Sequence, residues 1–267
     1  MQFELTKAYL NALGNAIESS NDEFLKVELE KLHPADIAEV LDELSTLKGK
    51  YLFELIEEEK AADVLVELED DVRDKFLKTF SSEEIADQII DNVESDDAAD
   101  VIGDLPDNIK TEVIAKIEKE DPEQASDIVD LLNYDEDTAG GLMAKEMVVV
   151  NQNWTITNCL REMRKQAEDQ DDVYAVYVVD DNQKLLGLLS LSKMLVSPTS
   201  KVVSEIYDKE VQFVTTDEEA EEVGNIMDKY DLVVLPVVDE SGVLQGRITI
   251  DDVVEVIKEE AEKDYQM

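Results

Sequence analysis

The sequence contains a single cysteine, Cys159, and a single histidine, His33, among its 267 residues. One cysteine excludes a disulfide framework. One cysteine with one histidine also excludes a tetrahedral zinc site of the usual Cys/His kind. Since disulfides mark oxidising compartments, we expect the chain to work in a reducing, cytoplasmic setting.

Long hydrophobic runs are missing as well. The longest purely apolar run is VYAVYVV at 173–179, far shorter than the roughly 18 residues that indicate a membrane span. The amino terminus lacks both a basic flank and an unbroken apolar core, so it is not a secretory signal. We therefore expect the chain as given to be soluble.

Sequence motifs of common enzymes are absent. The sequence has neither GxxxxGK nor GxGxxG, and it offers no Cys/His pair that would activate a nucleophile. Pairs of acids on helices are usually surface groups. We therefore expect the protein not to be an enzyme.

Positive charge is scarce. The chain has 24 Lys and Arg residues against 67 Asp and Glu residues, which gives a net charge of −43 and a pI near 4.1. Such a surface repels phosphate backbones and anionic lipid headgroups, so nucleic acid and direct membrane adsorption are disfavoured. Acid excess can serve solubility alone, but this excess is large and favours cations as partners.

The residues from about 20 to 133 have a helical pattern. Leu, Ile, Val and Ala recur at steps of three and four among acids. A short motif of a small residue, an acid, any residue and an aliphatic recurs at spacings of 24, 24, 13 and 27 residues. Its copies begin at Ala38, Ala62, Ala86, Ala99 and, in degenerate form, Ser126.

These spacings predict stacked helical hairpins, because two helices of ~10 residues with their turns fill about that length. The small Ala would allow close approach between helices. Helix starts are expected at Pro34 after His33, at the Ser residues of SSEE and SDDA, and at Asp121 of DPEQ. The acids after the small residues, such as Asp63 and Asp100, are either a solvated helix edge or groups that face a second domain.

The composition changes after Gly141 to runs of Val, Ile and Thr, and this half is duplicated. VVDDNQKLLGLLSLSKML from Val178 aligns without gaps with VVDESGVLQGRITIDDVV from Val237, a constant offset of 59. Upstream, Val148 pairs with Gln212 at an offset of 64. Each copy has the pattern strand, helix, strand, hairpin turn, strand, helix.

Apolar stripes predict which face of each first helix is buried. They comprise Ile156, Cys159, Leu160 and Met163 in one copy, and Ala220, Val223, Met227 and Tyr230 in the other. Cys159 is therefore expected in the core and not as a nucleophile.

The duplicated unit, with GLLSLSK and GRITIDD after its hairpins, resembles a pair of CBS domains. The order of acidic helical repeats, DTAGGLM, CBS pair and acidic terminal helix resembles the cytosolic part of the MgtE family of magnesium channels, over about 32–264. The resemblance implies a multidomain fold: an all-α superhelical N domain at 1–135, CBS domains at 136–204 and 205–255, and a connecting helix at 250–267.

The resemblance also implies a function. Members of this family carry a membrane domain after the final helix, so this chain is expected to be the region on the cytoplasmic side of the cell membrane, and to form a homodimer through its CBS domains. Several weak Mg²⁺ sites at the domain interfaces are expected to hold a closed state. The implied ligands are Asp63, Asp96, Asp100, Gly141, Glu219, Glu221, Asp231, Asp252, Glu255, Glu260 and Asp264.

An alternative stays open, in which the chain is a nucleotide-sensing CBS module with a helical scaffold for protein interaction. CBS pairs of other proteins hold ATP or AMP with a Ser or Thr and an Asp three residues later. The second copy has Thr249 and Asp252, whereas the first has Ser190 followed by Lys193.

The stretch YDEDTAGGLM at 134–143 joins the two halves. We expect its acids to belong to the helical domain. The double glycine is expected to let the backbone turn and approach the CBS pair closely, so that the junction acts as a hinge.

Overall fold

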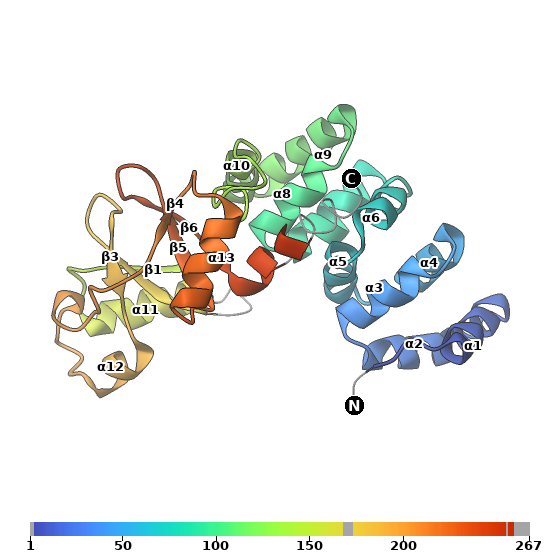
Figure 1. Ribbon diagram of the computed structural model, residues 1–267, viewed down its shortest axis with the longest axis horizontal. Helices are drawn as coiled ribbons and strands as arrows, with labels where there is room; N and C mark the ends of the chain where they lie inside the picture. The colour runs from blue at the N-terminus through green and yellow to red at the C-terminus, as the bar shows by residue number, and fades with distance from the viewer. Residues whose placement is uncertain (1–2, 168–172, 255, 259–267) are drawn as a thin grey trace. The chain divides into compact units, whose positions relative to one another are not determined.

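The structure is a computed structural model that describes residues 3–167, 173–254 and 256–258. The chain divides into two compact units, 1–128 and 129–267. The first is helical, and the second combines strands and helices (Figure 1). Within the described residues, no helix is both long and apolar enough to cross a bilayer.

Short helices follow one another closely in the first unit. They are α1 (Lys7–Glu18), α2 (Asp22–Lys31), α3 (Pro34–Asp42), α4 (Thr46–Phe53), α5 (Glu58–Val66), α6 (Asp70–Leu77), α7 (Ser82–Glu84), η1 (Ile85–Ile89), η2 (Ile90–Asn92), α8 (Ser95–Gly103), α9 (Asp107–Glu120) and α10 (Pro122–Leu131). The last of these runs across the boundary between the units.

The repeated motif places its small residue at helix contacts, as predicted. Ala38, Ala62 and Ala86 are at most 2% exposed, and α3 packs on α5, which packs on η1. Because alanine has no side-chain atoms beyond Cβ, the helices can approach closely at these positions. The copy at Ser126 was placed wrongly, because Ser126 is exposed and the neighbouring Ala125 is buried.

All four predicted helix starts are present, and three of them have the predicted residue before the first helical position. Ser81 accepts a hydrogen bond from Glu84 N, Asp121 accepts from the first turn of α10, and His33 precedes Pro34. The serine of SDDA differs only as a cap, since α8 begins at Ser95 itself and its N-cap position is Glu94. Ser95 is 2% exposed and is the first residue of the helix.

Within its described residues, the second unit contains two three-stranded sheets. The first copy comprises β1 (Val148–Asn151), α11 (Ile156–Gln166), β2 (Val176–Val179), β3 (Leu185–Leu188) and α12 (Leu191–Val196), followed by η4 (Val203–Glu205). The second comprises β4 (Val214–Thr215), α13 (Ala220–Lys229), β5 (Val234–Val238) and β6 (Leu244–Thr249), and helical residues 250–254 and 256–258 follow it.

The two copies match in detail. In each sheet the first strand runs parallel to the second, and the second runs antiparallel to the third. Register shifts fall at Val178/Val179 and at Val237/Val238. The turn residues Gln183 and Gly242, also 59 apart, both have positive φ. The predicted duplication and fold class are confirmed.

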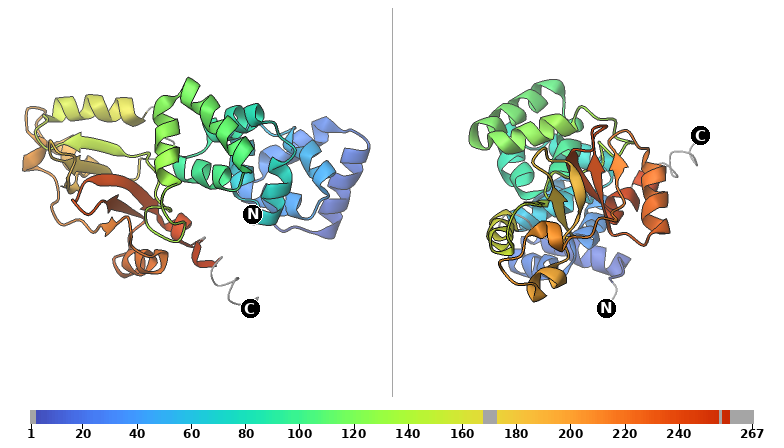
Figure 2. Two further views of the ribbon diagram at one scale, coloured as in Figure 1. Left: turned by 90° about the horizontal axis from the view of Figure 1, so that it is seen from above. Right: turned by 90° about the vertical axis from the view of Figure 1, so that its left-hand side faces the viewer.

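The core of the second unit lies on both faces of the first sheet. Val148, Val150 and Val178 pack with Cys159 of α11, while Tyr177 and Val179 on the opposite face pack with Leu244 of β6. Figure 2 shows the strands between α11 and α13. The hairpin tips also join, since Leu185 N donates to Gly242 O and Leu244 N donates to Gln183 O, both at 3.0 Å.

The predicted apolar stripes are mostly buried. Ile156, Cys159 and Met163 are at most 9% exposed, which confirms Cys159 as a core residue. Tyr230 was wrongly assigned to the second stripe. It is 45% exposed and forms the C-cap of α13, where the helix has already ended.

The junction segment forms part of the second unit. Ala139 N donates to Glu218 O, Gly140 N donates to Thr216 O, and Ala144 pairs with Arg247 of β6. The segment that enters the first copy therefore completes the sheet of the second. In the same way Asp208, which enters the second copy, pairs with Leu188 of β3.

The double glycine is required by close approach. A Cβ on Gly140 would lie 2.3 Å from Tyr134 Cδ1, and one on Gly141 would lie 2.4 Å from Asp135 O. A Cβ on Gly140 would also lie 2.9 Å from Thr216 O of the second copy, so the expected close approach to the CBS pair is present. In place of a free hinge, however, the segment is held by backbone hydrogen bonds within the second unit.

Candidate metal-binding acids and relatives of the chain

The predicted acids of the helical unit lie on α5 and α8. Asp63 and Asp100 are exposed next to the buried Ala of their motifs. Asp96 is 8% exposed and accepts a hydrogen bond from Asp97 N at 3.0 Å. Because Asp96 and Asp100 are four residues apart, they share one face of α8.

Glu219 and Glu221 stand at the beginning of α13. Glu219 is the N-cap residue, Glu221 lies in the first turn, and both are exposed. Acids at this end of a helix are stabilised by its dipole, which is a structural reason for their presence. The structure brings the segment of Gly141 close to them, because Thr138 pairs with Glu219 and Thr138 O accepts from Gly141 N.

Asp231 follows α13 in a turn. Its backbone is left-handed, with φ of 52°, and its side chain is exposed. Asp and Asn tolerate this conformation better than most residues do. The conformation accounts for an aspartate here without any ligand.

The structure brings together Thr249 and Asp252, the two candidate nucleotide residues of the second copy. Asp252 Oδ2 accepts from Thr249 N at 3.0 Å and from Thr249 Oγ1 at 2.5 Å. Burial raises the pKa of Asp252 despite these two hydrogen bonds. One carboxylate oxygen is thus already engaged in capping the helix that begins at residue 250. Glu255, Glu260 and Asp264 lie outside the described residues.

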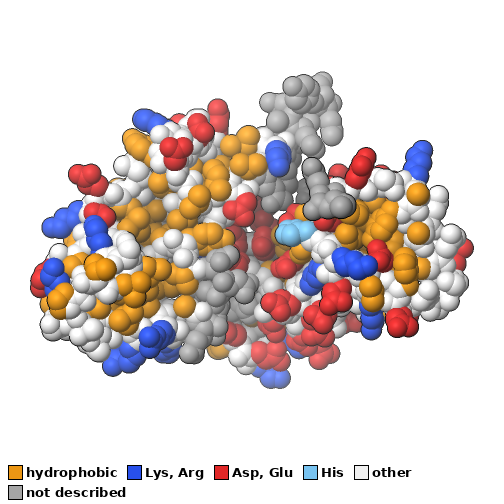
Figure 3. Space-filling model, turned by 90° about the horizontal axis from the view of Figure 1, so that it is seen from below, with side chains coloured by type: hydrophobic (Ala, Val, Ile, Leu, Met, Phe, Trp, Pro, Cys, Tyr) orange, Lys and Arg blue, Asp and Glu red, His pale blue; other side chains and the backbone are white. Residues whose placement is uncertain are grey.

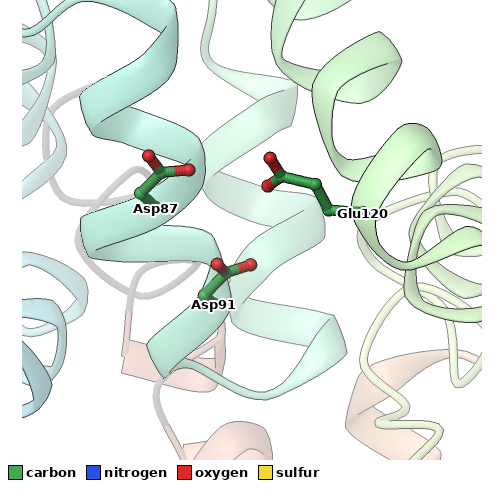
Figure 4. A group of neighbouring side chains, drawn as sticks. All are labelled: Asp87, Asp91 and Glu120. Atoms are coloured by element: carbon green, nitrogen blue, oxygen red, sulfur yellow. The ribbon is translucent and has the colours of Figure 1, made fainter.

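One cluster of three acids was not predicted. Asp87 of η1, Asp91 of η2 and Glu120 at the end of α9 offer carboxylate oxygens within 4.8 Å of one another (Figure 4). It is the one such group found among the described residues, and it contains none of the predicted ligands. Partial burial and the neighbouring Asp87 raise the pKa of Asp91.

A lysine already shares this cluster. Lys116 Nζ lies 2.5 Å from Asp87 Oδ1 and 3.6 Å from Glu120 Oε1. The cluster is therefore partly neutralised by the protein itself. Asp87 and Asp91 are four residues apart in the sequence, but the approach of α9 depends on tertiary packing and has no local signal.

A hollow of about 500 Å³ includes Ser190, which corresponds to Thr249, and is the candidate nucleotide position of the first CBS copy. Its lining includes Tyr174, Ser190, Leu191, Asp208 and Glu210, and no basic residue is among the described lining residues. The ammonium of Lys193 is bound to Asp208 at 2.7 Å. These residues do not fit a nucleotide phosphate, because two carboxylates would repel it.

Acidic side chains are prominent over the helical unit on the face drawn in Figure 3. On the second unit, large hydrophobic side chains are exposed as well. They include Leu191, Leu195 and Val196 at the end of the first copy, and Phe213, Val233 and Ile257 in the second.

Comparison with known families gives two matches. Residues 32–137 match the MgtE intracellular N domain, and residues 139–197 and 203–259 match the CBS domain. Together these matches cover most of the chain, in the order that the sequence motifs predicted.

Two curated relatives are magnesium transporters named MgtE. The one from Thermus thermophilus is 38% identical over 265 residues, which is 95% of this chain and 56% of the relative. The one from Enterococcus faecalis is 34% identical over 143 residues, which is 54% of this chain and 32% of the relative. The chain thus spans about half the length of the first relative and a third of the second.

Solved structures agree with these matches. The cytosolic domain of the Mg²⁺ channel MgtE in complex with ATP is 35% identical, with a TM-score of 0.79 over 92% of this chain and 99% of that one. The soluble part of a magnesium transporter has a TM-score of 0.77 at 24% identity and supports the fold. The chain therefore belongs to the MgtE family, in which it corresponds to the cytosolic region of helical N domain and CBS pair.

Proposed function

We propose that this chain is the magnesium-sensing region of an MgtE-type magnesium channel, on the cytoplasmic side of the cell membrane. Mg²⁺ bridges acids of the N domain (1–135), the CBS domains (136–204 and 205–255) and the connecting helix (250–267), and so stabilises a closed state. The observation that carries the proposal is that predicted ligands in both units present exposed carboxylates. These are Asp63, Asp100, Glu219, Glu221 and Asp231.

The chemistry of Mg²⁺ suits such acids. The ion prefers octahedral oxygen ligation and releases its waters reluctantly, so one or two carboxylates and several waters commonly hold it. An acid from one domain and an acid from another then form a weak site, which exists only when the domains are close. No site enclosed by one domain is needed.

Repulsion between the acids supplies the opening force. Two unit charges ~6 Å apart repel by about 0.7 kcal/mol at the dielectric constant of water, and by more where solvent is excluded. A weak site at about ten times its Kd stabilises the closed form by ~1.4 kcal/mol, whereas a switch from 1:99 to 99:1 needs ~5.5 kcal/mol. About four weak sites therefore give a steep response.

Small-angle scattering tests this proposal. Millimolar Mg²⁺ is expected to reduce the radius of gyration relative to EDTA. Asp100→Asn and Glu221→Gln each remove one ligand, and each is expected to lower the closed-to-open ratio about tenfold at a given Mg²⁺ concentration. Glu118→Gln, an exposed acid of α9 outside the predicted set, is the matched control. Equal responses from all three variants would contradict the ligand assignment.

The exposed hydrophobic side chains of the CBS pair support a homodimer through these domains. Isolated exposed apolar residues are common, but contiguous groups mark interaction surfaces. Leu195 and Val196 are 78% and 86% exposed. Light scattering is expected to give twice the chain mass, and Leu195→Glu with Val196→Glu is expected to give monomers.

A second candidate, nucleotide sensing, is favoured by the paired Thr249 and Asp252 alone. A relative of this chain was solved with ATP. Here the first copy does not fit a phosphate, so any nucleotide would use the second copy. Calorimetry with AMP and ATP in EDTA distinguishes magnesium sensing from nucleotide sensing, since nucleotide sensing requires heat of binding without a divalent ion.

A further inference from the structure

A groove on α11 is lined by basic side chains, in a chain where such residues are scarce. Its volume is about 500 Å³, and it is lined by Thr157, Leu160, Arg161, Arg164, Lys165 and Thr199. All of these are exposed except Leu160, which is half-buried and forms an apolar part of the wall. The three cations follow one another at i, i+3 and i+4, so they share one face of the helix.

The fold itself does not require this basic face. The duplicated helix α13 has the same place in the second copy, at an offset of 64. There, Arg161 corresponds to Asn225 and Arg164 corresponds to Asp228. The last turn of α13 thus tolerates an acid where α11 has arginine, so stabilisation of the helix dipole does not explain both cations.

The described acids leave most of this charge uncompensated. Glu162 lies 3.1 Å from Arg161 Nε. No ion pair to Arg164 or Lys165 is present within the described parts of the chain. Four acids at 168–172 follow α11 in the sequence and lie outside those parts. Anion binding measured on the intact chain includes their effect on the charge of the groove.

The large negative charge of the whole chain does not preclude a local anion site. The Debye length is about 8 Å at physiological ionic strength, so acids on distant elements are screened from the groove. Arginine binds phosphate oxygens through two parallel hydrogen bonds, and lysine adds a point charge. Three cations on one face suit an anion with several charged oxygens better than they suit a single carboxylate.

We propose that the α11 groove is a binding site for phosphate groups, with Arg161, Arg164 and Lys165 as the cationic ligands. The site is distinct from the nucleotide position of the first CBS copy, whose lining shares none of these residues. The proposal goes beyond magnesium sensing and does not rest on it. It also qualifies the sequence-based expectation that phosphate-bearing partners are repelled everywhere on the chain.

Calorimetry with inorganic tripolyphosphate in EDTA tests the proposal, since this probe has no base for a CBS nucleotide site and the chelator removes Mg²⁺. We expect saturable binding that weakens as NaCl is added. The variant Arg161→Gln/Arg164→Gln/Lys165→Gln is expected to bind at least about tenfold more weakly. The variant Lys26→Gln/Lys119→Gln/Lys229→Gln removes the same charge from exposed lysines elsewhere and is expected to bind like the original chain.

A further variant guards against misfolding. Arg164→Asp copies the residue that α13 has at the equivalent position, so the fold is expected to tolerate it, and circular dichroism checks this. It is also expected to weaken binding at least about tenfold. No heat of binding at millimolar tripolyphosphate would overturn the proposal, as would equal binding by the groove variants and the lysine control.

A second arm separates the two sources of phosphate. Flotation with phosphatidylglycerol vesicles asks whether phosphates on a bilayer reach the groove, with phosphatidylcholine vesicles as the reference. We expect free tripolyphosphate to bind and the anionic vesicles to bind more weakly, because the net charge of −43 opposes approach to a bilayer. If the original chain floats with the anionic vesicles and the groove variants float equally well, the assignment of the phosphate site to the α11 groove is contradicted.

Discussion

At the scale of single residues, Asp42 is a carboxylate poorly suited to its surroundings. It ends α3, where the negative end of the helix dipole disfavours an acid. Its Oδ1 is buried without a hydrogen-bond partner among the described residues. Burial, followed by the charges of Glu69, Glu39 and Glu43, raises the pKa of Asp42 from 3.8 to about 6. The ionised form is therefore destabilised in the folded state.

This raised pKa predicts a pH-dependent stability. Because the folded state binds the proton more tightly than the unfolded state, the contribution of Asp42 is most favourable below pH 4 and is lost as the pH rises through 6. Asp42→Asn is expected to increase the free energy of unfolding by about 1–2 kcal/mol at pH 7.5, after allowance for partial solvent screening. Urea denaturation at pH 7.5 and pH 5 measures this.

The gain from Asp42→Asn is expected to shrink at pH 5, where the original carboxyl is largely protonated. Glu118→Gln, at an exposed position of α9, serves as the control and is expected to change little at either pH. An equal gain at both pH values would mean that the effect does not come from ionisation of Asp42.

At the scale of elements, the junction at 134–144 determines how the CBS pair is completed. The sequence identified the change of composition and the double glycine. It gave no sign that this segment pairs with β6 of the second copy, because hydrogen bonds between residues about 100 positions apart leave no local pattern. The packing of Gly140 and Gly141 makes the segment part of the second unit.

Gly141→Ala is expected to destabilise the second unit, because its Cβ would fall 2.4 Å from a backbone oxygen that cannot move independently. A loss of about 2–4 kcal/mol is typical of such strain. Gly14→Ala is the matched control. It lies inside α1, and its Cβ would meet only Lys48 Nζ, at 3.8 Å. That change is expected to stabilise by about 0.5–1 kcal/mol.

Thermal unfolding followed by circular dichroism compares the two alanine variants. If Gly141→Ala unfolds at the same temperature as the original chain, the junction accommodates a Cβ at this position, and the expected steric strain is contradicted.

At the scale of the whole molecule, the sequence predicted patterns that repeat and missed contacts that depend on packing. The duplication and the Ala motifs were readable because each copy obeys the same local periodicity, and motif order identified the family. Ser126 was misplaced because α10 buries the neighbouring Ala125. Tyr230 was misplaced because α13 ends before it. The cluster of Asp87, Asp91 and Glu120 has no local signal, since α9 brings its third member from 29 residues away.

The predicted metal ligands came from the family resemblance and not from local periodicity. The structure describes most of them, and several are exposed in each of the two units; their bridging role is part of the proposal. Asp252 is an exception, because one of its oxygens is engaged by Thr249. The charge of −43 is a property of the chain as a whole, and the central claim is that hydrated divalent ions bring its two units together.

The most direct test is the distance between the two units. Spin labels on Lys119→Cys in α9 and Gln212→Cys before β4 report it by double electron–electron resonance. The native Cys159 does not interfere, because it is fully buried and burial raises its pKa to about 11. We predict a broad distribution of distances in EDTA and a narrower, shorter one in millimolar Mg²⁺. The same distribution in both conditions would contradict the account.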